Sequence, residues 1–147
     1  SYLDAISSWW VNLHGHAHPY IAEKISTQAF NLEHVMFAGF THRPAIELAE
    51  RLIKLTQMEK IFYSDNGSTA VETALKIALQ FWFNTDSSTK RKKILSFKDS
   101  YHGDTFGAMS ASGKNTFNRP FWDHLFSTET IDLPIAGREE SFLSHLQ

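Results

Sequence analysis

The residues Asp65-Asn66-Gly67-Ser68-Thr69 could bind an anion, because they join a strand-like run to a helix-like run. A Gly-Ser turn at the start of a helix directs backbone N–H groups and a hydroxyl outwards, where four helix N–H groups have no internal partner. The helix dipole adds partial positive charge there, so a phosphate is the most natural ligand. A capped helix after a tight turn would have the same sequence pattern. The lysine of a nucleotide-triphosphate P-loop is absent, since Gly67 is followed by Ser68 and Thr69, which argues against that kind of site.

A second strand-to-helix corner, Ser100-Tyr101-His102-Gly103-Asp104-Thr105, follows about 33 residues after the first. Its aromatic ring, Tyr101, is well shaped to stack on a flat ligand. The alternative is a buried tyrosine beside a loop histidine and a helix-capping aspartate. A phosphate-binding turn near an aromatic platform favours a flat, phosphorylated cofactor.

The adjacent tryptophans Trp9 and Trp10 favour core packing as much as a pocket wall. If residues 4–11 were an extended segment, the two side chains would point to opposite faces. One ring could then be buried while the other lines a pocket.

Three histidines, at positions 14, 16 and 18, lie beside Gly15 and Pro19 in a predicted loop. The chain has no cysteine, and no carboxylate partner lies near them in the sequence, so we predict loop histidines and no metal site.

Lys76 is a poor candidate for a Schiff-base lysine, since it lies about 12 Å along the helix from Ser68. We interpret it as the partner of Glu72 in an i,i+4 pair on the helix surface.

The composition indicates a globular protein: 42% of the 147 residues are hydrophobic, and the formal net charge is -2. The charge gives no basic footprint for nucleic acid, and no apolar run reaches the length of a membrane span. The first residues lack the pattern of a signal peptide, and we expect a cytoplasmic protein. Aromatic residues make up 14% of the chain, more than a small domain could easily bury, so we expect further chain or a second subunit to cover them.

Strands and helices alternate in the second half of the chain, which predicts an α/β layer with parallel strands whose carboxyl ends carry the ligand. Thr41 is the expected N-cap of a helix with Pro44 in its first turn. The predicted helices are residues 19–32, 44–55, 70–83, 104–110 and 139–146, and the predicted strands are residues 59–64, 93–97 and 126–133.

The motifs together resemble the class III, fold-type I aminotransferases that use pyridoxal 5'-phosphate (PLP). The general resemblance rests on the Gly67-Ser68 corner and on Tyr101-His102-Gly103. The double tryptophan and residues 104–110 narrow it to the members that act in biotin biosynthesis. Many other members, such as ornithine and 4-aminobutyrate aminotransferases, have a different residue at the position of Asp104. Asn66 replaces a serine that the resemblance predicts, but the resemblance assigns the phosphate contacts to the backbone of Gly67 and Ser68 beyond it.

This resemblance implies a transfer of the amino group of S-adenosylmethionine to 8-amino-7-oxononanoate, giving 7,8-diaminononanoate, in a ping-pong cycle. It implies that Gly67 and Ser68 bind the PLP phosphate, that Tyr101 stacks on the pyridine ring and contacts substrate, and that Trp9 lines the substrate pocket. Another class III omega-aminotransferase, or a non-catalytic cofactor- or phosphate-binding module, are the alternatives.

The resemblance also implies a fragment of the large domain, a mostly parallel sheet with helices on both faces, and a homodimer. We expect residues 1–38 to line the substrate pocket and residues 39–147 to form an incomplete PLP-binding domain. The Schiff-base lysine and the aspartate facing the pyridine nitrogen have no match here, so we expect them downstream. The 147 residues contain no catalytic residue on this interpretation, and we expect the chain alone to be inactive.

Overall fold

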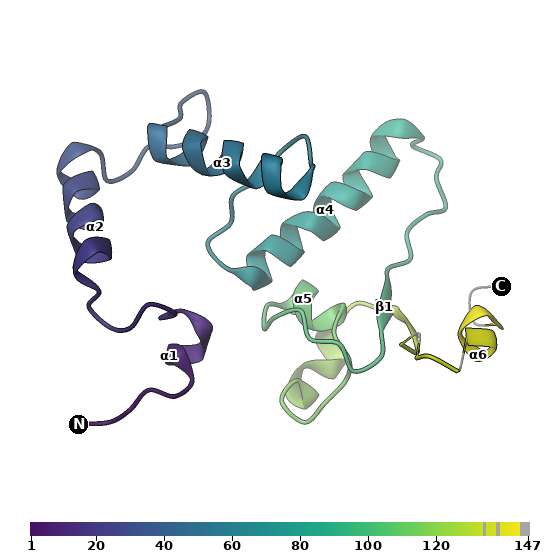
Figure 1. Cartoon of the computed structure of the whole chain (residues 1–147). Helices are drawn as coiled ribbons and strands as arrows, with labels where there is room; N and C mark the ends of the chain where they lie inside the picture. Colours follow the sequence, from purple (N-terminus) through teal and green to yellow (C-terminus); the bar gives the residue numbers. More distant parts are fainter. Residues whose placement is uncertain (134, 138, 145–147) are drawn as a thin grey trace. The chain divides into compact units, whose positions relative to one another are not determined.

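The computed structural model describes residues 1–133, 135–137 and 139–144, and the chain divides into two compact units, Ser1–Ile61 and Phe62–Gln147. The first unit contains three helices, α1 (Ser7–Trp10), α2 (Pro19–Asn31) and α3 (Arg43–Thr56). The second contains α4 (Gly67–Thr85), β1 (Leu95–Phe97), α5 (Phe106–Ser110), the 3-10 helix η1 (Arg119–His124), β2 (Glu129–Ile131) and α6 (Glu139–Ser144). Figure 1 shows these elements along the chain.

The two longer helices of the first unit follow the predicted pattern. Pro19 occupies the first turn of α2, where a missing N–H costs no hydrogen bond. In α3 the N-cap is His42 rather than the predicted Thr41, and its Nδ1 accepts a hydrogen bond from the Ala45 N–H at 3.2 Å. The prediction was wrong by one residue because an imidazole nitrogen can replace the hydroxyl that usually accepts this bond.

Residues 4–11 are not the extended segment that the sequence suggested. Ser7, Ser8, Trp9 and Trp10 all have positive φ, between 44° and 72°, and form one left-handed turn. Such a turn costs non-glycine residues about 1–2 kcal/mol each, which propensity alone does not anticipate.

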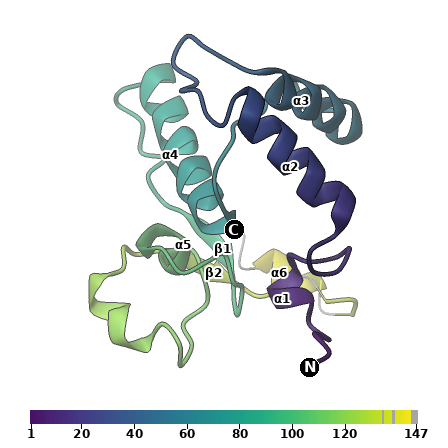
Figure 2. The same cartoon turned by 90° about the vertical axis from the view of Figure 1, so that its left-hand side faces the viewer.

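The second unit confirms the predicted α/β arrangement. Strands β1 and β2 pair in parallel, with Leu95 opposite Glu129 and Phe97 opposite Ile131, and the connection between them contains α5 and η1. A lysine–glutamate ion pair, Lys93–Glu129, joins the starts of the two strands. Figures 1 and 2 both show α5 beside the first turns of α4. These features place the two predicted corners in the same unit.

The predicted strand at residues 59–64 does not form within the described residues, where the sheet consists of β1 and β2 alone. A strand is defined by ladder hydrogen bonds to a neighbour, and an apolar run cannot show whether that neighbour is present. The helix predicted for 139–146 is observed as α6, and its last two positions lie outside the described residues.

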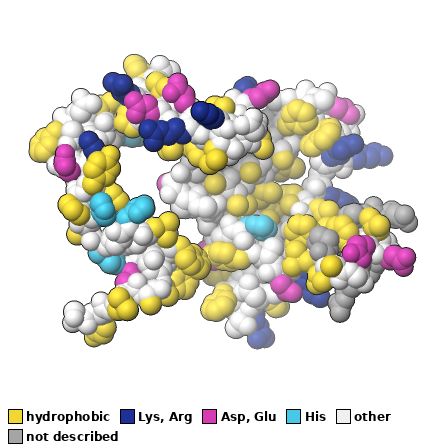
Figure 3. All heavy atoms as spheres, in the orientation of Figure 1, with side chains coloured by type: hydrophobic (Ala, Val, Ile, Leu, Met, Phe, Trp, Pro, Cys, Tyr) yellow, Lys and Arg dark blue, Asp and Glu magenta, His cyan; other side chains and the backbone are white. Residues whose placement is uncertain are grey.

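Mostly small side chains are buried in the second unit. Many large hydrophobic side chains are exposed in both units, and Figure 3 shows hydrophobic side chains on the surface. Ala108, Met109 and Ala111 are buried in and just after α5, and Ser96 and Asn118 are buried with them. Trp9, by contrast, is 69% exposed. Many aromatic side chains are thus exposed, in line with the expectation that a small domain could hardly bury all of them. None of the helices in the described part of the chain is long and apolar enough to cross a membrane.

Candidate functional site

The first turn of α4 presents two backbone N–H groups, those of Gly67 and Ser68, without a hydrogen-bond partner among the described residues. The N-cap is Asn66, whose Oδ1 accepts a bond from the Thr69 N–H at 3.0 Å. The Thr69 hydroxyl accepts in return from the Asn66 N–H, which completes a capping box. A Cβ at Gly67 would meet open space, so the backbone here is accessible to a ligand. This geometry, at the positive end of a 19-residue helix, suits a phosphate.

Asp65, which directly precedes the N-cap, supports this corner. Its Oδ1 accepts a hydrogen bond from the Thr69 hydroxyl at 2.6 Å, and this bond, more than any other contact, lowers the pKa of the Asp65 carboxyl. Asn66 differs from the serine expected at this position, and its side chain nevertheless makes the capping bond.

The second predicted corner lies directly against the first. The Asp104 N–H donates to the Ser68 Oγ at 3.0 Å. Gly103 is buried with φ 128°, and a Cβ at that position would overlap the Ser68 hydroxyl, so both the conformation and the close approach require glycine. Because Ser68 Oγ accepts from Asp104, its own hydrogen remains available for donation to an anion. The two motifs that the sequence singled out therefore form one site.

Tyr101 lies on the loop that approaches this corner, with 66% of its surface exposed. Its hydroxyl donates to Asp104 Oδ2 at 2.8 Å, and this bond to a carboxylate raises the pKa of the Tyr101 phenol. The hydroxyl is thus held by the same residue that contacts Ser68, while the exposed ring can receive a flat ligand.

Glu72 also belongs to the site, although the sequence suggested only a surface pair with Lys76. Its Oε1 accepts hydrogen bonds from the N–H groups of Gly107, at 2.6 Å, and Ala108, at 3.3 Å. The nearby Thr105 hydroxyl, followed by these amides, holds the pKa of the Glu72 carboxyl below its usual range, and the charge of Lys76 contributes least. Thr105 Oγ1 makes no hydrogen bond of normal geometry among the described residues, so the two amides are the bonds that hold the carboxylate in place. The spacing in the sequence could have identified Glu72 as part of the site, because it follows Ser68 by four residues and so lies on the same face of the helix.

Trp9 lies in the first unit, within the left-handed turn. Asp4 Oδ2 accepts a hydrogen bond from the Ser8 hydroxyl at 2.7 Å and also contacts His16 Nε2 at 2.7 Å. The Ser8 hydroxyl is the largest cause of the lowered pKa of Asp4, followed by the Ser8 backbone and by His16. The Trp9 and Trp10 rings lie side by side, with centroids 5.3 Å apart, so the expectation of opposite faces was wrong. Left-handed backbone brings consecutive side chains together, whereas a strand separates them.

The three histidines at 14, 16 and 18 do not form a metal centre in the described part of the chain, where no cluster of three His, Asp or Glu side chains could hold an ion. His16 instead contacts Asp4, a carboxylate 12 residues away that a reading of local sequence overlooks.

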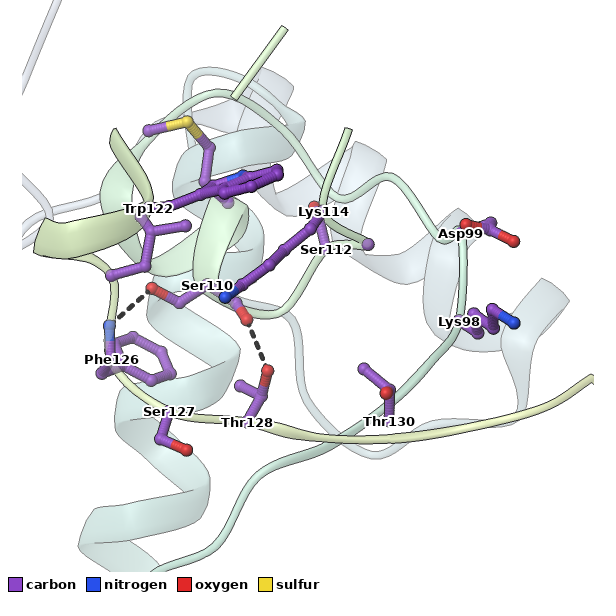
Figure 4. Close-up of a pocket in the computed structure, with 13 residues that line it drawn as sticks. Lys98, Asp99, Ser110, Ser112, Lys114, Trp122, Phe126, Ser127, Thr128 and Thr130 are labelled. Atoms are coloured by element: carbon purple, nitrogen blue, oxygen red, sulfur yellow. Dashed lines mark hydrogen bonds between the residues drawn. The ribbon is translucent and has the colours of Figure 1, made fainter. Parts of the chain in front are cut away.

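A separate cavity of about 490 Å³ lies elsewhere in the second unit (Figure 4). Ser110 fixes its wall, since its Oγ accepts from the Phe126 N–H at 3.1 Å and its carbonyl accepts from the Thr128 hydroxyl at 2.7 Å. Lys114 lies over the Trp122 ring, 5.3 Å from its centroid. Neither Ser68 nor Tyr101 lines this cavity, and the first turn of α4 does not open into it. We therefore favour the α4 corner as the candidate phosphate site, because the N–H groups of Gly67 and Ser68 and the Ser68 hydroxyl are available there to bind an anion.

Comparison with known proteins defines the class. The sequence model of the family "Aminotransferase class-III" matches residues 1–142, and the chain belongs to this family. Adenosylmethionine-8-amino-7-oxononanoate aminotransferase of Synechococcus elongatus is 57% identical over 134 residues, which are 90% of this chain and 31% of that protein.

Solved structures give the same result. The crystal structure of adenosylmethionine-8-amino-7-oxononanoate aminotransferase from Methanocaldococcus jannaschii is 37% identical, with a TM-score of 0.88 over 99% of this chain and 33% of that one. An amine transaminase from an uncultivated Pseudomonas species, solved in a PLP-bound form, is 28% identical, with a TM-score of 0.78 over 97% of this chain and 34% of that one. The fold is that of the fold-type I transaminases, and the chain spans about a third of the length of the relatives it matches.

Proposed function

We propose that this chain supplies the phosphate-binding corner and the ring platform of a PLP-dependent aminotransferase. The observation that carries the proposal is the contact between the two motifs, in which the Asp104 N–H binds Ser68 Oγ beside two available N–H groups. Family membership and a structural neighbour solved with PLP support the same cofactor.

The residues of the corner fit PLP. On this proposal the N–H groups of Gly67 and Ser68 and the Ser68 hydroxyl bind the phosphate, and the exposed Tyr101 ring lies against the pyridine. PLP supplies an electron sink for reactions at the substrate's amino-bearing carbon. The chain's own residues bind and orient: they fix one end of the cofactor by charge-assisted hydrogen bonds and cover one face of its ring.

The proposed reaction transfers an amino group from S-adenosylmethionine to 8-amino-7-oxononanoate, giving 7,8-diaminononanoate in biotin biosynthesis. The names of the relatives that are 57% and 37% identical support this substrate pair, whereas an omega transaminase from Pseudomonas jessenii is 28% identical. Trp9, in its left-handed turn, is proposed to line the substrate pocket. We propose that residues 1–38 line the substrate pocket. Residues 39–147 are proposed to form an incomplete PLP-binding domain.

The Schiff-base lysine of the family has no match within residues 1–147, and on this proposal it comes from another part of the polypeptide. Exposed apolar and aromatic side chains, Trp9 and Phe37 among them, support a homodimer that covers them. A protein that is active as a monomer in sedimentation velocity at low concentration would contradict the dimer.

A cytoplasmic location is proposed from the biosynthetic role, and fractionation of cells tests it.

An amino-donor screen tests the reaction. The intact gene product, loaded with PLP, is incubated with 8-amino-7-oxononanoate and either S-adenosylmethionine or alternative donors such as lysine, alanine and 4-aminobutyrate. The proposal predicts that 7,8-diaminononanoate forms with S-adenosylmethionine. Product from another donor alone would favour a different class III omega-aminotransferase, and no product from any donor would favour the non-catalytic binding module.

A further inference from the structure

Glu72 lies one helical turn after Ser68, and both side chains contact the same segment of the chain. Ser68 contacts that segment at Asp104, and Glu72 contacts it three and four residues later, at Gly107 and Ala108. A spacing of four residues on α4 corresponds to about 6 Å along the helix axis. The segment between the two contacts is therefore attached to one face of α4 at two points.

Both contacts are unusually close. A Cβ on Gly103 would overlap the Ser68 hydroxyl, and a Cβ on Gly107 would overlap the Glu72 carboxylate. Gly107 is buried, and Glu72 is itself half-buried against it. The carboxylate accepts two backbone N–H groups at once, which a neutral side chain of the same length cannot do with equal strength.

The Ser68 contact alone would leave the orientation of the segment undetermined. One hydrogen bond fixes a distance but permits rotation about it. Tyr101 is linked to the segment at both ends: its hydroxyl donates to Asp104, and the N–H of the next residue, His102, donates to Ser112 Oγ, which in turn donates to the Ala108 carbonyl. A second attachment at Gly107 removes that rotation. The direction in which the exposed Tyr101 ring faces then depends on both ends of the segment.

We propose that Glu72 is a positioning residue that orients Tyr101 over the phosphate-binding corner by fixing the Gly103–Ala108 segment to α4. This inference rests on the proposed function, because it concerns how the Tyr101 ring meets the cofactor. The Glu72 carboxylate binds the Gly107 and Ala108 N–H groups and not the N–H groups of the phosphate-binding corner. Its effect is expected on the geometry of the bound cofactor rather than on the strength of phosphate binding.

The test uses the intact protein with Glu72→Ala, Glu72→Gln and Gly107→Ala, and with Gln80→Ala as the matched control. Gln80 is on the same helix, and its side chain donates to the exposed Asn84 and not to the Gly103–Ala108 segment. Hydrogen exchange of the apoprotein reports the Gly107 and Ala108 amides without any cofactor. Visible circular dichroism per molecule of bound PLP reports ring orientation, and a PLP titration gives the dissociation constant.

Glu72→Ala should speed hydrogen exchange at these two amides by about tenfold or more, because each amide loses a charge-assisted hydrogen bond to the carboxylate. The dichroism per bound PLP should fall by about half or more, while the PLP dissociation constant should change less than about threefold because the phosphate-binding groups remain. Glu72→Gln retains one acceptor oxygen and should lie between the wild type and Glu72→Ala. Gly107→Ala should reproduce the loss from the other side of the contact, and Gln80→Ala should match the wild type.

Faster exchange in Glu72→Ala with unchanged dichroism would overturn the inference, because the segment would then loosen without moving the ring. Dichroism and affinity that fall together with the melting temperature would also overturn it, in favour of a purely structural role. If Glu72→Ala does not fold, the comparison of Glu72→Gln with Gly107→Ala decides the question by the same criteria. A wild-type protein that binds no PLP would instead refute the proposed function, and this inference with it.

Discussion

Replacing Ser68 by alanine tests the phosphate site, because it removes one hydrogen bond within the protein and one proposed hydrogen bond to the phosphate. The two losses can be measured separately. The Ser68 Oγ accepts from the Asp104 N–H at 3.0 Å in the protein itself, and on the proposed function its hydrogen is donated to the PLP phosphate. The first bond joins neutral groups and contributes about 0.5–1.5 kcal/mol, whereas the second is charge-assisted and contributes about 1.5–3 kcal/mol. The free energy of unfolding of the apoprotein should fall by the smaller amount. The free energy of PLP binding should fall by the larger amount.

The expected change in PLP affinity follows from the second bond. A loss of about 1.5–3 kcal/mol corresponds to a rise of roughly 10- to 150-fold in the dissociation constant. Titration of the apoenzyme of the intact protein with PLP, followed by absorbance or calorimetry, measures it. Thermal unfolding without PLP measures the first bond separately.

Lys76→Ala is the matched comparison, since Lys76 lies two turns along the same helix and contributes least to the pKa of Glu72. Its PLP affinity should stay close to that of the wild type. If Lys76→Ala abolishes cofactor binding while Ser68→Ala leaves it unchanged, the phosphate does not bind at the Gly67-Ser68 corner and the reasoning is refuted.

Three further predictions concern the groups around this corner. Tyr101→Phe should keep the ring but lose the bond to Asp104, so kcat/KM should fall less than in Tyr101→Ala, which also lacks the ring; equal losses in steady-state kinetics would contradict a stacking role. The folded-state pKa of Glu72 is lowered, so the carboxylate stabilises the protein above its usual pKa near 4.5, and this stabilisation is lost as pH falls through the folded-state pKa. The melting temperature of Glu72→Gln should therefore depend less on pH below about pH 5 than that of the wild type. Parallel curves for the two proteins would refute this. Asn66→Ala removes the cap of α4 and should cost about 0.5–2 kcal/mol of apoprotein stability, measured by urea unfolding, and an unchanged midpoint would show that the capping bond to Thr69 is dispensable.

The features that the sequence predicted well are those with local causes. The apolar stripe of the central helix, observed as Gly67–Thr85, repeats with the helical period, and its start is marked by a capping residue and a Gly-Ser turn. Alternating strands and helices indicated a parallel pair, which β1 and β2 form. The sequence placed the phosphate turn near the aromatic corner, and the bond from the Asp104 N–H to Ser68 Oγ joins them, although the strand expected before the first corner is not observed in the described residues.

The features that the sequence did not predict depend on contacts between distant residues or on unusual backbone. Glu72 looks like an ordinary surface residue until Gly107, 35 residues later, is placed against it. The left-handed turn at Ser7–Trp10 is held by Asp4 and His16, and no propensity scale favours four such residues in succession. Strand formation at 59–64 depends on a neighbouring strand, which the residues themselves cannot specify.

A structure of the intact protein with PLP bound tests the central claim most directly. The account predicts phosphate oxygens within about 3 Å of the Gly67 and Ser68 N–H nitrogens and of Ser68 Oγ, a normal hydrogen-bond distance. It also predicts the Tyr101 ring against the pyridine. A phosphate bound elsewhere, for example between Lys98 and Lys114 in the separate cavity, would contradict it.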